Sequence, residues 1–341
     1  MREALEALDS LHLNFSKEGL FTLNLTLAFI MFGVALEIKP DHFRKILLNP
    51  KSTVIGFVSQ FFFLPALTFI VILLFSSVVT PTIALGMILV ASCPGGNISN
   101  FISSLAKGNI ALSVSLTAIA TISAIILTPL NFAIWGKLYI MAYNVKETHL
   151  LQPITIDPIE MFKTVFILLG IPLILGMLFN HKFPKLTEKI VKPLKNLSIL
   201  LFMAIVVIMF TKNYEHFINH IFYIFIIVLI HNFIALSTGF SVASLFKRSS
   251  FDRRSITIET GIQNSGLALV LLFNPNIFPE TITINGIARP LEIGGMAFIA
   301  AWWGIWHILA GLSVATIWAR IPIGEGHKIF NRFKRTSKNV N

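Results

Sequence analysis

Apolar segments long enough to cross a lipid bilayer recur along this 341-residue sequence, and they constrain its fold more than any other feature. A transmembrane helix needs about 20 mostly apolar residues. Nine segments approach or exceed this length, at residues 20–37, 52–76, 82–106, 109–136, 159–180, 196–211, 217–246, 255–274 and 293–319. Composition agrees, because 55% of the residues are hydrophobic and only 13% are charged. The sequence therefore predicts an all-α polytopic membrane protein with nine transmembrane helices.

The basic residues lie between these segments, and they are distributed very unevenly. About 20 of the 27 Lys and Arg residues fall in alternate loops on one side and in the tail. The positive-inside rule assigns that side to the cytoplasm. We therefore expect a multi-pass protein of the inner or plasma membrane, with its N-terminus outside and its C-terminus in the cytoplasm. The net charge of +11 has the same cause and does not indicate a nucleic-acid partner.

The expected organisation is an external N-terminal segment (1–19), a transmembrane domain (20–320) and a basic cytoplasmic tail (321–341). The first segment lacks the basic start, apolar centre and small-residue cleavage site of a signal peptide. Cys93 is the one cysteine in the sequence, so no intramolecular disulfide can form.

Glycine and polar residues interrupt two of the predicted helices. Residues 93–100 read CPGGNISN, and residues 259–266 read ETGIQNSG. Non-helical backbone at membrane depth is tolerated only where it is buried in protein or lines a cavity. The interruptions lie five segments apart, as expected for two inverted five-helix repeats of which the first has lost its first helix. Two broken helices that cross near the midplane are the usual layout of a secondary transporter.

Glu259 is the acidic residue that most requires an explanation. A charge at the centre of a bilayer costs about 2.5–3.5 kcal/mol or more, so such residues are paired or functional. Gly261, Gln263, Asn264 and Ser265 follow it closely, and a carboxylate among neutral oxygens suits a hard cation such as sodium. The alternative is a salt bridge with Arg253 or Arg254, about two turns earlier.

Other residues supply neutral oxygens or free N–H groups. The oxygens come from Asn97, Ser99 and Asn100 in the first interruption, from Ser113 and Thr117 one turn apart, and from Gln60. The half-helices after Asn100 and Gly266 would present positive N-terminal ends to a carboxylate or sulfonate. For each polar residue alone, ordinary interhelical hydrogen bonding is the alternative.

His231 and His307 also lie inside predicted helices. Each is either a hydrogen-bonded packing residue or a contact for substrate or protons. The sequence contains no nucleotide-binding, zinc or catalytic-triad motif, so we expect neither an enzyme nor transport driven by hydrolysis.

In these motifs the chain resembles the bile acid:sodium symporter family, of the bacterial or organellar type. Both interruptions look like that family's crossover motifs. Further similar stretches, in the same order, are 33–40, 59–61 with Pro65, 108–109, 112–114, 231–232 and 306–307. The resemblance implies a panel domain (about 20–47 and 159–212) and a core domain (about 52–140 and 217–319).

The resemblance also implies a set of sites between and within these domains. One sodium site would use Ser99, Asn100, Ser113, Thr117 and Glu259. A second would use Gln60, Glu259 and Gln263 with the backbone oxygens of Thr260 and Ile262. Substrate would lie near Asn97, Asn264, Ser265 and Gly266, with His307 as a neighbour.

Two departures from the family pattern lie close to the expected substrate rather than to the sodium ligands. The family often has Thr-Ala where this chain has Asn97-Ile98, and Asn where it has Ile308. The predicted function is therefore uptake of an organic anion, a bile acid or a related carboxylate or sulfonate, coupled to two sodium ions by alternating access. The predicted partners are this anion and the lipid bilayer, with no nucleic acid and no obligatory protein partner. The alternatives are a proton-coupled or uncoupled anion carrier and a non-transporting membrane receptor.

Overall fold

A computed structural model describes residues 2–9, 17–38, 50–96, 98–146, 156–212, 214–279, 281–284 and 287–321. Several predictions fall outside these residues. They are the basic tail after residue 321, part of the N-terminal segment, residues 39–49 of the expected panel, and the substrate role of Asn97.

Each apolar segment of the sequence coincides with a helix, or with a broken or bulged helix, in the described part of the chain. In chain order these are α2 (Lys17–Glu37), α4–η1–α5 (Pro50–Val58, Ser59–Phe63, Leu64–Leu74), α6 and α7 (Pro81–Ser92, Ser99–Leu105), α8 (Ile110–Lys146), α9–η2–α10 (Pro158–Val165, Phe166–Gly170, Ile171–Lys182), α11 (Pro184–Lys212), α12 (Tyr214–Leu245), α13 and α14 (Ser250–Gly261, Ser265–Leu272) and α15 (Gly294–Arg320). Among the described residues, five helical stretches are long and apolar enough to cross a membrane unaided. The two interrupted segments are divided into halves that are too short, and neither α2 nor α11 is among the five, so the count of nine crossings and the inverted repeat stay predictions.

Two of the long helices contain a π-helical turn, and each turn is explained by a proline. In η1 the backbone N–H of Leu64 reaches back to Ser59 O, directly before Pro65. In η2 the N–H of Ile171 reaches Phe166 O, directly before Pro172. Proline has no N–H and its ring collides with the preceding turn, so a widened turn accommodates it. The first of these bulges contains Gln60.

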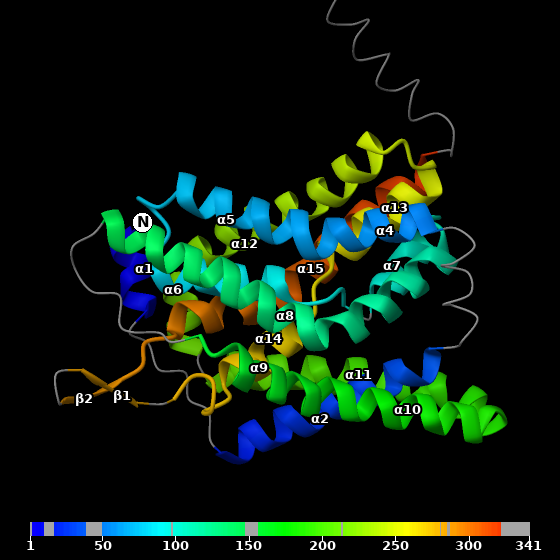
Figure 1. Cartoon of the computed structure of the whole chain (residues 1–341), viewed down its shortest axis with the longest axis horizontal. Coiled ribbons are helices and arrows are strands. Elements are labelled where there is room, and N and C mark those ends of the chain that lie inside the picture. The colour runs from blue at the N-terminus through cyan, green and yellow to red at the C-terminus, as the bar shows by residue number, and fades with distance from the viewer. Residues whose placement is uncertain are drawn as a thin grey trace, which may run out of the picture.

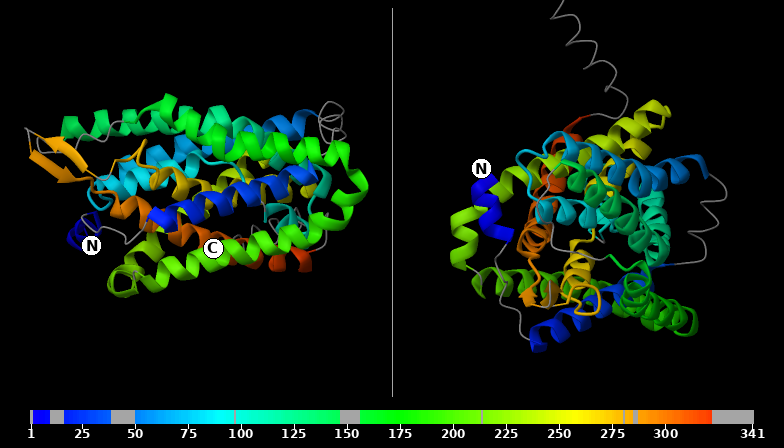
Figure 2. Two further views of the ribbon diagram at one scale, coloured as in Figure 1. Left: turned by 90° about the horizontal axis from the view of Figure 1, so that it is seen from below. Right: turned by 60° about the vertical axis from the view of Figure 1, so that its left-hand side comes forward.

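The helices form two layers (Figure 1). In the smaller layer α2 lies between α9–η2–α10 and α11, as Figure 2 shows from below. Gly176 permits the close approach of α10 to α2, because a Cβ there would lie 2.5 Å from Ala35 Cβ. The larger layer contains α4–η1–α5, α6, α7, α8 and α12 to α15, and it holds both interrupted helices.

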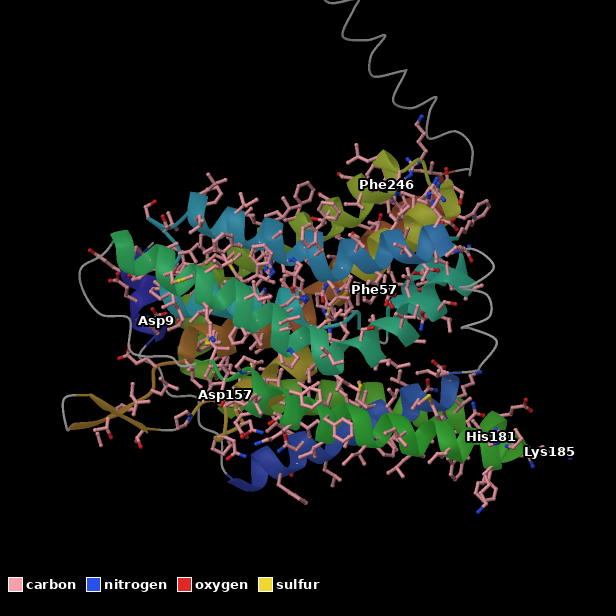
Figure 3. The ribbon with its side chains drawn as sticks, viewed as in Figure 1. Asp9, Phe57, Asp157, His181, Lys185 and Phe246 are labelled. Carbon is pink, nitrogen blue, oxygen red and sulfur yellow. The ribbon has the colours of Figure 1, made fainter. Side chains whose placement is uncertain are left out.

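The two ends of the helical layers carry different elements. Figure 3 labels Asp9 at one end, and His181 and Lys185 at the other. We call them the Asp9 face and the Lys185 face. The helix α1 (Arg2–Asp9) and the hairpin of β1 (Thr281–Ile284) and β2 (Ile287–Pro290) lie at the Asp9 face.

Helix α1 and the β1–β2 hairpin were not predicted from the sequence. Leu5 and Leu8 of α1 are fully buried, and the helix packs against α6, α12 and α15. Asp9, its last residue, accepts hydrogen bonds from Thr80 Oγ1 at 2.8 Å and Thr82 Oγ1 at 2.5 Å. The Leu5–Leu8 spacing was a usable signal for an amphipathic helix, but eight residues are too few for a reliable periodicity.

Large apolar side chains are exposed along the outward sides of the long helices. Examples are Phe62, Ile126, Ile167, Phe222 and Phe233, which are between 57% and 67% exposed. Such a surface is unfavourable in water and favourable in hydrocarbon. The chain is accordingly an integral, multi-pass membrane protein.

Candidate functional site

The two interruptions cross and are joined to each other by backbone hydrogen bonds. Gly96 N donates to Ile262 O at 2.7 Å, and Asn264 N donates to Pro94 O at 2.8 Å. Gly95 and Gln263 thereby form an isolated antiparallel β-bridge. Backbone groups released by each broken helix are thus satisfied by the other one, as a membrane interior demands.

Glu259 lies beside this crossing and is 2% exposed. Its Oε2 accepts a hydrogen bond from Ser99 Oγ at 2.6 Å, and its Oε1 accepts one from Thr117 Oγ1 at 2.8 Å. These bonds join three helices, namely α13, α7 and α8. The carboxylate is therefore held by hydroxyl groups that have lone pairs of their own.

The salt-bridge alternative for Glu259 is not what the structure contains. Arg254 donates to Ala106 O at 2.7 Å and to Ile321 O at 3.0 Å, and so ties together the ends of α7 and α15. Arg253 lies against the ring of Phe240. In the described residues, neither guanidinium forms an ion pair with Glu259.

The other residues of the first predicted sodium site belong to the same network. Asn100 Oδ1 accepts a hydrogen bond from Ser113 Oγ at 2.9 Å and lies 3.2 Å from Thr117 Oγ1, whose hydrogen is directed at Glu259. Ser113 Oγ can in turn accept from Ser103 Oγ, which lies 3.1 Å away. The five predicted residues are thus brought together. Ser103 was missed, although its place one turn after Ser99 on a polar helix face was a usable signal.

The residues of the second predicted sodium site form an adjoining network. Gln60 Nε2 donates to Gln263 Oε1 at 2.8 Å and to Cys93 O at 3.0 Å. Gln263 Nε2 donates in turn to Thr260 O at 2.8 Å. The Ile262 carbonyl accepts the bond from Gly96 across the crossing. Gln60, Thr260, Ile262 and Gln263 are each at most 1% exposed, so the neutral oxygens gathered here are shielded from solvent.

Glycine is required in the first interruption by the closeness of Glu259. A Cβ on Gly95 would lie 2.4 Å from Glu259 Oε1, and a Cβ on Gly96 would lie 3.0 Å from Gln263 O. No ordinary side chain fits at the first of these distances. The glycines that suggested a broken helix therefore also make room for the carboxylate and for the second strand of the crossing.

The residues predicted to contact substrate occupy different environments. Asn264 is the N-cap of α14, where its Oδ1 accepts from Leu267 N at 3.0 Å. The N–H of Leu267, one of the groups expected to bind an anion, therefore already donates to the Asn264 side chain. Ser265 and Gly266 start α14 and are buried. Within the described part of the chain, Ser265 Oγ and His307 Nδ1 have no hydrogen-bond partner.

His231 is a packing residue in this structure. Its Nε2 lies 2.9 Å from Thr68 Oγ1, and its ring lies edge-to-face with Trp303, with 4.7 Å between ring centroids. The next residue, Asn232, donates from Nδ2 to Gly261 O at 2.7 Å, although the sequence had suggested no role for it. Cys93 is buried and free, as expected of a small core residue.

A helical membrane protein whose two broken helices cross beside a buried carboxylate has the layout of a secondary transporter. Comparison with known sequences agrees with this class. The chain belongs to the Sodium Bile acid symporter family, whose sequence profile matches residues 24–220.

Three relatives span most of the chain. It is 32% identical over 313 residues to the uncharacterized sodium-dependent transporter YocS of Bacillus subtilis (strain 168), covering 90% of this chain and 88% of YocS. It is 29% identical to the probable chloroplastic sodium/metabolite cotransporter BASS2 of Oryza sativa subsp. japonica, over 83% of this chain and 64% of BASS2. It is 25% identical to the ileal sodium/bile acid cotransporter of Cricetulus griseus, over 81% and 77% respectively. The family is one of sodium-dependent transporters of small solutes, not of enzymes.

Proposed function

We propose that this protein is a symporter that couples the inward movement of two sodium ions to the uptake of an organic anion. The observation that carries the proposal is the Glu259 carboxylate, buried at the crossing and held by Ser99 and Thr117 at 2.6 and 2.8 Å. A buried charge of this kind persists where it has a functional partner. A hard cation with oxygen ligands is the partner that fits a carboxylate, an amide oxygen and three hydroxyl groups.

The hydroxyl groups give the first site a way to change between two states. Here Ser99 and Thr117 point their hydrogens at Glu259. Rotation of each hydroxyl about its C–O bond would turn lone pairs toward a sodium ion between the same groups. The two states use one set of side chains, so sodium entry needs no new residue from another helix.

The second ion would lie in the Gln60–Gln263 network, among the carbonyls of Thr260 and Ile262. Those oxygens are already close together and desolvated. Gln60 Oε1 has no hydrogen-bond partner among the described residues, which leaves one buried acceptor ready for a cation. Glu259 adjoins Thr260 in the chain and would serve both ions.

The proposed substrate is a monoanion, a bile acid or another carboxylate or sulfonate. The N-terminus of α14 carries positive partial charge, and the buried Ser265 hydroxyl adjoins it. Two bound sodium ions would offset Glu259 and the substrate, so the loaded site would be neutral. Sodium would then favour anion binding through charge alone.

The driving force is sufficient for accumulation. Two sodium ions with one monoanion carry one net charge, worth about 2.3 kcal/mol at about 100 mV. A tenfold sodium gradient adds about 1.4 kcal/mol per ion. The total of about 5 kcal/mol corresponds to accumulation by three to four orders of magnitude.

Alternating access is supported by an asymmetry between the two second half-helices. In this proposal the smaller layer is the panel and the larger layer is the core. All residues of α14 are buried, and α14 packs against α2 and α9 of the panel. In α7, by contrast, Phe101 and Leu105 are 52% and 41% exposed. We infer from this asymmetry that the layers are closed toward the Asp9 face and that the site is reached from the Lys185 face.

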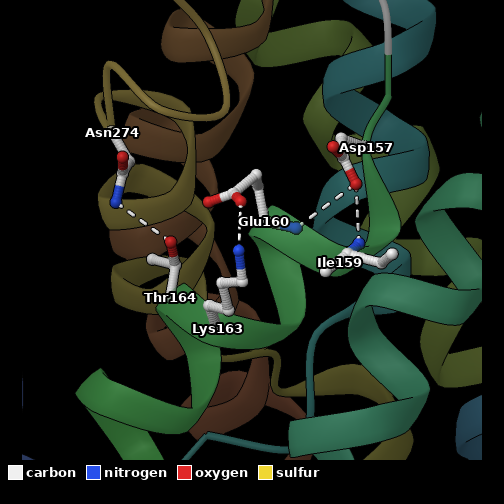
Figure 4. A network of polar contacts seen from close by, with 6 residues as sticks. All are labelled: Asp157, Ile159, Glu160, Lys163, Thr164 and Asn274. Carbon is white, nitrogen blue, oxygen red and sulfur yellow. Dashed lines mark hydrogen bonds and ion pairs between the residues drawn. The ribbon is translucent and has the colours of Figure 1, made fainter.

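Within the described part of the chain, a side-chain hydrogen bond joins the two layers beside α14. Asn274 Nδ2, just after α14, donates to Thr164 Oγ1 of α9 at 3.2 Å (Figure 4). Asp157 caps α9 by accepting from Ile159 N at 2.8 Å, and Pro158 starts the helix. If the basic Lys185 face is cytoplasmic, as the charge distribution predicts, this is an inward-open arrangement.

Uptake into proteoliposomes tests the proposal. Labelled taurocholate and a set of small carboxylates and sulfonates would be supplied with sodium or potassium outside. We expect uptake that requires sodium, is trapped inside the vesicles and disappears in Glu259→Gln. Glu160→Gln is the matched control, since Glu160 pairs with Lys163 at a partly exposed site. Equal uptake in potassium would contradict sodium coupling, and binding without trapping would indicate a receptor.

A further inference from the structure

Asn232 of α12 holds the end of the broken helix α13. Its Nδ2 donates to the carbonyl of Gly261, the last residue of α13, at 2.7 Å. A helix end leaves several carbonyls without intrahelical partners, and each needs another donor when it is buried. Asn232 is 1% exposed, so no solvent competes for this bond. Its Oδ1 has no hydrogen-bond partner among the residues described, so the side chain is oriented by this bond.

Helix α12 is a rigid support for this bond. A Cβ on Gly239 would lie 2.7 Å from Thr257 Cα, and a Cβ on Gly261 would lie 2.3 Å from Leu236 Cδ2, so α12 and α13 are in direct contact over the two turns of α12 that follow Asn232. His231 fixes the rotation of α12 through its contacts with Thr68 and Trp303. The Asn232 amide is therefore placed by packing rather than by its own flexibility.

The hydrogen bond fixes one peptide plane at both ends. The peptide between Gly261 and Ile262 presents the Gly261 oxygen to Asn232. Its N–H donates to Ile258 O at 2.9 Å. Because a peptide unit is planar, two such bonds determine its orientation. The carbonyls on either side of this plane belong to Thr260 and Ile262, the two backbone ligands of the proposed second sodium site.

We propose that Asn232 is a positioning residue of the second sodium site. By fixing the Gly261–Ile262 peptide, it aims the neighbouring carbonyls before the ion arrives. Preorganised ligands bind an ion more tightly, since no reorientation of the backbone is needed on binding. The inference rests on the proposed function and assigns a role to a residue outside the predicted ligand sets.

The test compares Asn232→Leu with Thr238→Val in the full-length protein. Leucine is close to asparagine in size but cannot donate a hydrogen bond. Thr238 lies on the same helix, is 2% exposed, and among the described residues its hydroxyl donates to Ile234 O of its own helix at 2.7 Å. The first readout is the sodium dependence of anion uptake. The second is the shift in melting temperature of the purified protein between potassium and sodium, which needs no transport.

We expect Asn232→Leu to raise the half-saturating sodium concentration about tenfold and to lower the Hill coefficient toward 1. The sodium-induced melting shift should shrink in the same variant. Thr238→Val should keep the wild-type sodium values. If leucine prevents folding, Asn232→Ala gives the same comparison with less steric change.

Two outcomes would overturn the proposal in distinguishable ways. A variant that melts lower in potassium but keeps the wild-type half-saturating sodium and Hill coefficient would make Asn232 a purely structural residue. A wild-type protein with no response to sodium in either readout would refute the proposed function itself, and this inference with it.

Discussion

A single methyl group added at Gly95 should disable the first sodium site. A Cβ there would lie 2.4 Å from Glu259 Oε1 and 2.9 Å from its Cδ. Van der Waals contact requires roughly 3.4 Å, so in Gly95→Ala the carboxylate must retreat by about 1 Å. The backbone of Gly95 is not in the left-handed region, so alanine is acceptable there except for this collision.

The magnitude follows from the two hydrogen bonds of Glu259, at 2.6 and 2.8 Å. A retreat of about 1 Å takes at least one of them beyond hydrogen-bonding distance. A hydrogen bond to a charged group contributes about 1.5–3 kcal/mol. Because the same oxygens would hold sodium, we expect the half-saturating sodium concentration to rise about 10- to 150-fold.

Sodium-dependent uptake in proteoliposomes measures this effect, with melting temperature as the check on folding. The matched control is Gly33→Ala in α2, where the added Cβ would lie 3.5 Å from Ser198 Oγ, an ordinary contact. Alanine in a helix interior adds up to about 1 kcal/mol of stability, so this variant should melt no lower than wild type. A folded Gly95→Ala protein whose half-saturating sodium stayed within about twofold of wild type would refute the reasoning.

Three further predictions follow from single contacts. Thr117→Val should abolish sodium-coupled uptake while Thr121→Val retains it, because Thr121 Oγ1 bonds only its own helix, to Thr117 O at 2.7 Å; equal losses in both would contradict the site. Burial raises the pKa of Asp9 from 3.8 to about 6, so the folded state binds this proton more tightly than the unfolded chain. Stability should therefore fall by about 3 kcal/mol as pH rises from about 4 to 6, and Asp9→Asn should remove that fall in melting experiments. Thr164→Val should increase hydrogen–deuterium exchange in α14 about fivefold by removing the bond from Asn274, and unchanged exchange would show that the bond does not hold the layers together.

Much of the site could be anticipated from residue types alone. Glycine beside polar residues within an apolar segment predicts a broken helix from local sequence alone. The backbone groups freed by such a break must be buried in protein, because lipid offers them no hydrogen-bond partner. Glu259 is conspicuous for the same reason. Ser99 and Thr117 could be noted as sources of neutral oxygens, and the resemblance to the symporter family grouped them with Glu259. The structure then places them within 2.8 Å of the carboxylate.

Other residues could not be found in this way. Asn232 belongs to a stretch that resembles the family, but the sequence assigned it no role, and its bond to Gly261 is known only from the structure. For His231 the sequence left two roles open, and Thr68, 163 residues away, decides between them. The short helix α1 gives too weak a periodicity to predict, yet its Asp9 binds Thr80 and Thr82 beside the start of α6.

By itself, then, the sequence indicated that this protein lies in a lipid bilayer. It also indicated the helical segments, the two places where helices break, and the carboxylate that needs a partner. These follow from the cost of exposing polar groups to hydrocarbon, which depends on local composition. Only the tertiary structure decided which oxygens meet, which peptide plane is bonded by Asn232, and which helices of the smaller layer cover α14. Those features depend on contacts between helices far apart in the chain, whose rotation and approach are set by packing rather than by any local pattern.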